Sequence, residues 1–155
     1  MAERFFYEQI VNIMCCPIFA YDEKGKLLDK IGSADKEWWL WLGYDRKKAE
    51  SILSEKKGYP VIYTGNKGYT AAVFYDKKNR TALAAGPVMF GLTAEQKAEH
   101  EEETKNRKKI GRKEDTPAFC SLDAFISGCL LLHWYLTGEE MTVCELWDRS
   151  RENYE

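Results

Sequence analysis

The fold is decided between residues 59 and 88, where the sequence reads YPVIYTGNKGYTAAVFYDKKNRTALAAGPV. Three runs rich in β-branched and aromatic residues are separated by Gly65-Asn66-Lys67-Gly68 and by Asp76-Lys77-Lys78-Asn79. Short connections of this composition join neighbouring antiparallel strands. We therefore expect strands at 60–64, 69–75 and 80–88, arranged as a meander.

A second pair of strands is predicted nearer the N-terminus. Residues 18–21 and 27–31 flank the turn Asp22-Glu23-Lys24-Gly25, which is typical of a hairpin. An amphipathic helix over 4–14 precedes this hairpin, and a short Trp-rich helix and a polar helix at 46–57 follow it. Ser33 and Asp35 are the candidate N-caps of the Trp-rich helix. The sequence thus predicts an α+β fold with a five-stranded antiparallel sheet.

The C-terminal part of the sequence predicts three helices. A capping box at Thr93 opens a strongly charged helix that ends at Gly111. Ser121 begins an apolar helix that Gly138 ends, and a second capping box at Thr142 opens the last helix. We expect one domain over 1–155: a sheet core with a helical insert and the charged helix in 1–118, and helices for dimerisation and signal transfer in 119–155.

Composition excludes several classes of protein. The 155 residues carry 23 basic and 25 acidic side chains, a net charge of −2, which argues against a polyanion-binding surface. The longest uncharged apolar run, 124–138, is shorter than the roughly 20 residues that span a bilayer. No secretory signal is recognisable, so we expect a cytoplasmic protein. The aromatic content of 14% is high, with five Trp, nine Tyr and seven Phe.

The central strands are apolar on both faces. Leu83 and Ala85 alternate with Ala82, Ala84 and Gly86, so both faces are covered by other elements, or one face is hollow. A row of small residues lets either a helix or a ligand approach closely. Helix packing is the commoner use of such positions.

The densest aromatic cluster is Trp38-Trp39-Leu40-Trp41. In a helix Trp38 and Trp41 share a face, while Trp39 points elsewhere. Such a helix either roofs a core or lines a pocket or an interface. For a ligand held between the sheet and this helix, the candidate contacts are Trp38, Trp41, Tyr63, Phe74, Tyr75 and Met89.

No recognisable catalytic or metal-binding motif is present. The sequence contains two His and lacks a Ser-His-Asp context, a Gly-rich phosphate loop and an HExxH motif. Cys129 and His133 have the i, i+4 spacing of two metal ligands, which are too few for a structural zinc site. The adjacent Cys15 and Cys16 are not a redox motif, and the five Cys are expected to be reduced. We expect no catalytic residue, no metal, no cofactor and no enzyme; a thiolate enzyme would need an exposed cysteine of low pKa.

Four stretches carry a resemblance to a known family. They are Pro17-Ile18-Phe19-Ala20-Tyr21-Asp22 with Lys24-Gly25, then Gly58-Tyr59-Pro60, then Ala85-Gly86-Pro87-Val88, and Ser121-Leu122 with Leu136-Thr137-Gly138-Glu139-Glu140. In these, and in the order of its elements, the chain resembles the N-terminal regulatory domain of bacterial AraC-family transcription regulators, with a PAS/GAF-like sensor architecture. The resemblance implies a domain that senses a signal and passes it through C-terminal helices to a DNA-binding part with two helix-turn-helix motifs.

The chain ends at Glu155 without a basic helix-turn-helix segment. We therefore expect an excised fragment or a standalone sensor, with no direct nucleic acid contact. The leading hypothesis is a ligand-sensing, dimerising regulatory domain that binds an unidentified small-molecule effector or signalling partner. The alternative is a protein-interaction module without a small-molecule pocket. The expected homodimer interface consists of Leu130, Trp134, Leu146 and Trp147.

Overall fold

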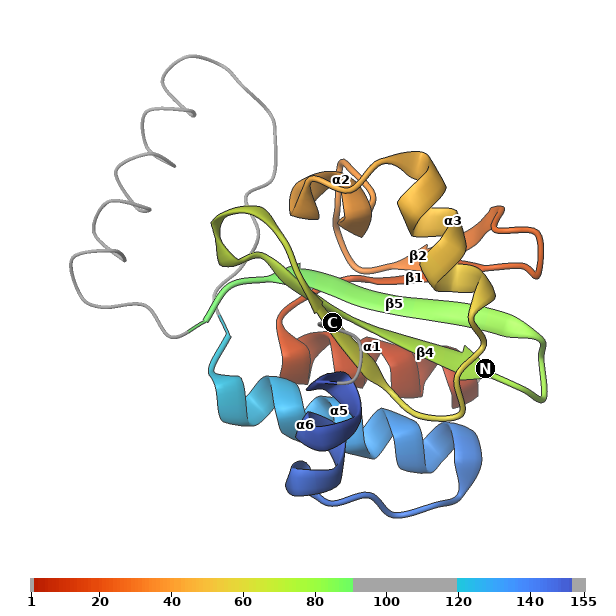
Figure 1. Cartoon of the computed structure of the whole chain (residues 1–155). Helices are drawn as coiled ribbons and strands as arrows, with labels where there is room; N and C mark the ends of the chain where they lie inside the picture. The colour runs from red at the N-terminus through yellow and green to blue at the C-terminus, as the bar shows by residue number, and fades with distance from the viewer. Residues whose placement is uncertain (1, 91–119, 152–155) are drawn as a thin grey trace.

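The computed structural model describes residues 2–90 and 120–151, and the charged helix expected at 93–111 lies outside them. The described chain is an α+β fold built on a five-stranded antiparallel sheet (Figure 1). Its elements are, in order, α1 (Ala2–Met14), β1 (Ile18–Tyr21), β2 (Leu27–Ile31), α2 (Trp38–Leu42), α3 (Arg46–Ser54), β3 (Val61–Thr64), the 3-10 turn η1 (Asn66–Gly68), β4 (Thr70–Asp76), β5 (Thr81–Val88), α5 (Leu122–Thr137) and α6 (Val143–Arg151).

The strands lie in the order β2-β1-β5-β4-β3. The hairpin β1–β2 and the meander β3–β4–β5 are confirmed. A long-range pairing joins the two units, because β1 runs antiparallel to β5 with Ile18 opposite Ala85 and Tyr21 opposite Ala82. This pairing places the short β1 inside the sheet, between the edge strand β2 and the central strand β5.

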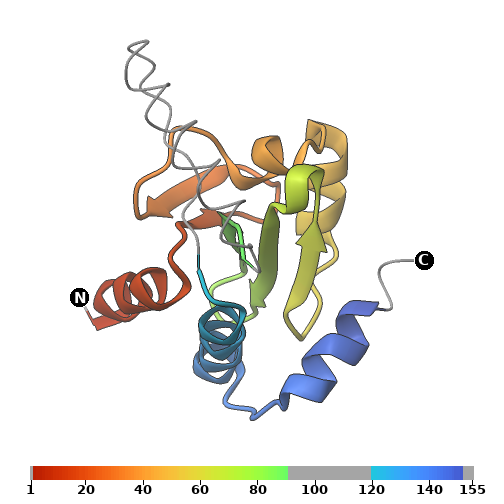
Figure 2. The same ribbon diagram turned by 90° about the vertical axis from the view of Figure 1, so that its left-hand side faces the viewer.

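Helices cover both faces of the sheet. α2 and α3 lie on one face, and α1, α5 and α6 lie on the other (Figures 1 and 2). Successive strand residues point to opposite faces, so Ala71, Ala82 and Ala84 pack toward α2 and α3. Their neighbours Phe74 and Leu83 pack toward α1 and α5. Of the two arrangements left open by the strand pattern, the structure thus has the one with both faces covered.

Most helix ends agree with the capping signals. The Ser121 hydroxyl accepts a hydrogen bond from the Ala124 N–H at 3.1 Å, and Thr142 accepts one from the Glu145 N–H at 3.1 Å. Gly138 ends α5 with φ of 76°. Two expectations were wrong. The N-cap of α2 is Glu37, not Ser33 or Asp35. α3 ends at Ser54 instead of residue 57, and Lys56 adopts a positive φ of 51°.

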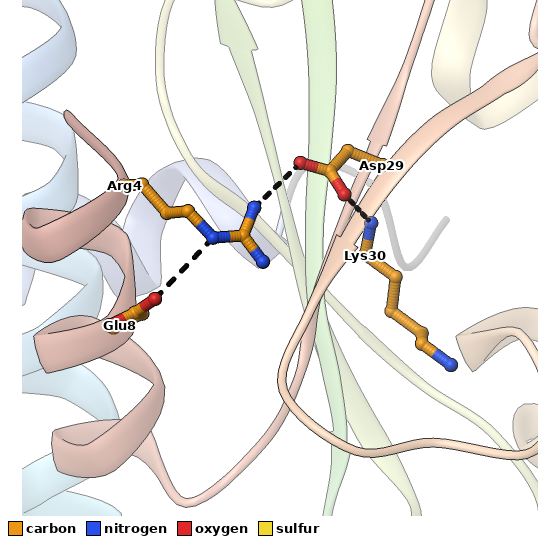
Figure 3. Close-up of polar contacts among 4 residues, drawn as sticks. All are labelled: Arg4, Glu8, Asp29 and Lys30. Atoms are coloured by element: carbon orange, nitrogen blue, oxygen red, sulfur yellow. Dashed lines mark hydrogen bonds and ion pairs between the residues drawn. The ribbon is translucent and has the colours of Figure 1, made fainter. Parts of the chain in front are cut away.

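An exposed ion-pair network connects α1 to the edge strand β2 (Figure 3). Arg4 lies 3.4 Å from Glu8, one turn further along α1, and 3.1 Å from Asp29 of β2. Asp29 also accepts a hydrogen bond from the Lys30 N–H. All three charged side chains of the ion pairs are about half exposed, so the network contributes little to the stability of the fold.

Across residues 2–90 and 120–151, no helix combines the length and the apolar character that a membrane span requires.

Candidate functional site

The Trp-rich helix α2 packs closely against one face of the sheet. Trp38 is 0% exposed, Trp39 and Leu42 are also buried, and Leu40 points outward at 49% exposed. Trp38 and Trp39, which the helical spacing places on different sides of α2, are thus both buried. Both pack in one cluster because the alanines of β4 and β5 leave room for a helix to approach the sheet closely.

A buried polar group lies beneath the start of α2. The Tyr21 hydroxyl of β1 donates a 2.8 Å hydrogen bond to Oε1 of Glu37. Tyr21 is almost fully buried, and burial, followed by the hydrogen bond and the charge of Glu37, raises the pKa of this phenol well above its ordinary value. The phenol therefore remains a hydrogen-bond donor at neutral pH and cannot act as a base.

The indole N–H of Trp38 lies beside the Tyr21 oxygen. It nevertheless reaches no acceptor in hydrogen-bonding geometry within the described part of the chain. A buried donor without a partner costs about 1–3 kcal/mol and is uncommon in native proteins. Tyr21, Glu37 and Trp38 together form a buried polar site, in which the Trp38 N–H lies beside the Tyr21 oxygen without good hydrogen-bonding geometry; we call it the Tyr21–Trp38 site.

Trp41 lies at the rim of the same layer. Its ring makes an edge contact with Tyr69 at 5.6 Å between centroids, and the Lys36 ammonium lies 4.6 Å from the Trp41 ring. Tyr44 extends this rim, because its hydroxyl donates to the Thr64 carbonyl and its ring makes an edge contact with Trp38. The rim is aromatic and positively charged, and it holds α2 to the turn between β3 and β4.

Tyr63 and Tyr75 lie in a different place, in a narrow cleft between the end of α3 and strands β3 and β4. Water can occupy about 10 Å³ of this cleft, roughly one molecule, and Phe74 also contributes to the wall. The Tyr63 hydroxyl donates a 3.3 Å hydrogen bond to Glu55 across the mouth. Burial, followed by Glu55, raises the pKa of Tyr63. In this structure the cleft is too small for an organic ligand.

The six expected ligand contacts therefore do not surround one pocket. Trp38 and Trp41 lie at α2, and Tyr63 and Tyr75 lie at the α3 cleft. The Phe74 side chain belongs to the cluster on the opposite face of the sheet. Met89 follows β5, and its carbonyl accepts a hydrogen bond from the Cys120 N–H.

A wider hollow of about 340 Å³ lies between the β1–β2 turn and α3. Its wall carries both signs of charge, with Glu23, Lys24, Lys47 and Glu50 among the lining residues. Pockets for small organic molecules are mainly apolar. Nothing in this hollow selects one sign of charge or one ligand chemistry.

The four expected dimer contacts have different exposures. Leu146 is fully buried in the core, Leu130 and Trp147 are partly buried against it, and Trp134 is 51% exposed. The structure adds exposed apolar residues that the sequence pattern did not single out. Phe5 and Ile13 of α1 and Leu131 of α5 are exposed, as is Trp134, and α1 and α5 pack against each other. We call these four residues the α1/α5 outer surface.

The Cys129–His133 pair is buried in the core. Burial lowers the pKa of His133. The charge of Glu139 opposes this shift and the charge of Arg149 adds to it, so the imidazole is neutral at pH 7. The described residues contain no group of three or more His, Cys, Asp or Glu placed to hold a metal ion.

Comparison with known proteins identifies no relative. No protein-family model matches the chain, and the comparisons with curated proteins and with solved structures give no match. The site at Tyr21 and Glu37 was missed by the sequence pattern because the two residues meet only when α2 packs over β1. The one available signal was an acidic residue directly before the Trp-rich helix, at a position where no capping bond is made.

Proposed function

We propose that this chain is a ligand-sensing and dimerising regulatory domain of a cytoplasmic transcription regulator of the AraC kind. Its support is the order of elements on which the resemblance rests: a helix, a hairpin, a helical insert, a three-stranded meander and long C-terminal helices. The proposal assigns recognition to the helical insert and dimerisation to the opposite helical layer. It includes no catalytic role, no cofactor and no direct nucleic acid contact.

The single observation that carries the sensor proposal is the buried N–H of Trp38, which lies beside the Tyr21 oxygen outside good hydrogen-bonding geometry. Next to the Tyr21–Glu37 hydrogen bond, the site holds no acceptor in good hydrogen-bonding geometry to the indole N–H. A ligand oxygen of a carboxylate or carbonyl group would complete it, and the surrounding rings of α2 would contact the apolar part of the same ligand. We therefore place the ligand between α2 and β1, at the Tyr21–Trp38 site.

Signalling then requires that the ligand favours one position of α2 over another. A ligand that binds two arrangements equally well shifts neither population. Trp38 is 0% exposed, so entry of a ligand moves α2 away from β1. Because β1 pairs with β5, and Ile18 of β1 lies in the same core cluster as Ile10 and Met14 of α1, a displacement at β1 would be transmitted across the sheet.

The experiment is a thermal-shift screen of small carboxylates and carbonyl compounds against the wild type and Trp38→Phe. Phe retains a ring in the core and removes only the indole and its N–H. The expected result is a ligand that raises the melting temperature of the wild type and has a much smaller effect on the variant. Trp39→Phe is the matched control, and it should respond as the wild type does. A screen without any stabilising compound, or one with equal shifts in Trp38→Phe, contradicts the proposal.

The dimer proposal rests on the α1/α5 outer surface. Phe5, Ile13, Leu131 and Trp134 expose large apolar side chains on one helical layer, and such patches mark association sites. A second copy of the chain is the proposed occupant, in a two-fold arrangement. Sedimentation at tens of micromolar, roughly the range of weak modules, should show a dimer that Trp134→Glu disrupts. Leu40→Glu, on the exposed side of α2, should leave it intact; a monomeric wild type contradicts the proposal.

The alternative, a protein-interaction module, has one observation in its favour. The cleft beside Tyr63 admits about one water molecule, and the tryptophans of α2 are mostly packed into the core. A negative ligand screen together with association through the α1/α5 outer surface would favour this alternative over the sensor.

A further inference from the structure

Four of the five cysteines gather where α1 ends and α5 begins. Cys15 and Cys16 follow α1, Cys120 precedes the N-cap of α5, and Cys129 lies two turns into α5. The thiols are near enough to affect one another electrostatically: Cys16 is influenced by the other three, and Cys129 by Cys120. The fifth cysteine, Cys144, is exposed on α6.

Within this cluster Cys15 and Cys120 form a contacting pair. The Cys15 thiol lies 3.9 Å from the carbonyl oxygen of Ile13, and the Cys120 thiol lies 3.6 Å from the same oxygen. The two thiols also interact directly with each other. Cys15 is exposed to solvent, whereas Cys120 is only 7% exposed. The pair therefore combines one thiol that reagents can reach with one that is buried.

The backbone of Cys15 is itself unusual. It has φ of 56°, directly after the last residue of α1. Helices commonly end with a residue in this left-handed conformation, and it is usually Gly because a side chain costs about 1 kcal/mol there. The chain has Cys at this position, so the backbone is locally strained where the Cys15 thiol lies, at the end of α1.

We propose that Cys15 and Cys120 are a redox-responsive pair that forms an intramolecular disulfide by exchange with a low-molecular-weight disulfide such as oxidised glutathione. In the first step the Cys15 thiolate attacks one glutathione sulfur, forming a Cys15–glutathione bond and releasing one glutathione thiolate. In the second step the Cys120 thiol loses its proton to solvent and attacks the Cys15 sulfur, releasing the second glutathione. The two protein thiols lose two electrons, and one glutathione disulfide is reduced to two thiols.

The order of these steps follows from accessibility. Burial, followed by the interaction with Cys15, raises the pKa of Cys120 to about 11, so Cys120 is a poor nucleophile toward a reagent in solution. Toward a mixed disulfide on Cys15 it reacts within the molecule, where a high effective concentration offsets its low thiolate fraction. Cys16 and Cys129 are more deeply buried, and burial raises the pKa of both thiols.

The disulfide would link the end of α1 covalently to the residue before the start of α5. These two helices carry the α1/α5 outer surface, and they cross at Met14 and Gly128, beside the pair. The redox state of the pair would therefore alter the relative mobility of the two helices. This inference goes beyond the proposed function and stands whether or not a ligand or a dimer is found.

The test is to equilibrate the full chain with mixtures of reduced and oxidised glutathione, quench with acid and map the peptides without reduction. A Cys15–Cys120 linkage, lighter than the dithiol by about two mass units, is expected. Cys144 is the matched internal control, since it is exposed but outside the cluster, and it should stop at the glutathione adduct. At equal glutathione, the adduct at Cys15 should be at least about tenfold less abundant than that at Cys144.

Two variants separate the steps. Cys120→Ala should accumulate the glutathione adduct at Cys15. Cys15→Gly should form neither product, and its melting temperature should equal or exceed that of the wild type because Gly suits the left-handed backbone. The proposal is overturned if wild-type Cys15 remains free, accumulates the adduct as Cys144 does, or pairs with Cys16 or Cys129. The wild-type map decides this even if a variant fails to fold.

Discussion

Met14 of α1 lies directly over Gly128 of α5, so closely that a side chain at residue 128 would overlap the Cγ of Met14. The same two helices meet again where Phe6 stacks on Tyr135, with ring centroids 3.9 Å apart and an angle of 18° between the planes. The first contact brings the end of α1 against the first half of α5, and the second brings the beginning of α1 against the end of α5, so the two helices run antiparallel. The layer that carries the exposed apolar residues is thus a closely packed helix pair.

The first prediction concerns Gly128→Ala. In an exposed helix this change is stabilising by about 1 kcal/mol, because Ala has the higher helix propensity. Here the added methyl group meets Met14 in a filled core, and overpacking costs about 1–3 kcal/mol. We expect a net loss in the free energy of unfolding, measured by urea denaturation. Ser127→Ala, one residue away and exposed, is the control and should be neutral or stabilising; a stabilised Gly128→Ala contradicts the close contact.

The second prediction concerns the hydrogen bond between Tyr21 and Glu37. Tyr21→Phe removes the 2.8 Å bond and leaves the partly buried Glu37 carboxylate without this donor. We expect the free energy of unfolding to fall by about 1–3 kcal/mol. Tyr63→Phe, which removes the longer and exposed 3.3 Å bond to Glu55, should cost less than about 1 kcal/mol. Chemical denaturation of both variants measures the difference. Equal losses would show that the Tyr21–Glu37 bond stabilises the fold no more than the Tyr63–Glu55 bond does.

The third prediction is a pH dependence of stability due to His133. Its folded pKa is below the ordinary 6.5, so the unfolded chain binds more protons as the pH falls from 6.5 to the folded pKa. The stability due to the neutral imidazole is fully present above pH 6.5, and it is lost as the pH falls from 6.5 to the folded pKa of His133. Denaturation at about pH 7.5 and about pH 5.5 should show this loss. His133→Gln should flatten the profile, and substitution of the only other histidine, His100→Gln, should preserve it.

The fourth prediction concerns the ion pairs of Arg4. Both Arg4–Glu8 and Arg4–Asp29 join half-exposed side chains, and such pairs contribute about 0–1 kcal/mol. Arg4→Ala should therefore change the free energy of unfolding by less than about 1 kcal/mol, and the change should shrink at high salt. A salt-independent loss of several kcal/mol would mean that Arg4 has a structural role beyond these pairs.

Local patterns in the sequence were sufficient for most of the secondary structure. Turns and helix caps depend on residues only a few positions apart, so a short stretch of sequence is enough to predict them. This holds for the turn at Gly65–Gly68 and for the capping residues Ser121 and Thr142. The apolar residues on both faces of β4 and β5 left two arrangements open, and the structure has the one in which both faces are covered. The start of α2 was predicted wrongly, because Ser33 and Asp35 are not its N-cap. Glu37 holds that position, and its carboxylate accepts a hydrogen bond from Tyr21 instead of capping α2.

The sequence by itself thus determined the elements, the two hairpin units and the apolar character of both sheet faces, because these depend on backbone preferences and on side-chain period. Only the tertiary structure decided which distant residues meet. The β1–β5 pairing places Tyr21 under α2, and the α1–α5 crossing brings Cys15 to Cys120. Such encounters depend on how whole helices and strands pack, and packing free energy is summed over many contacts that no short stretch of sequence contains.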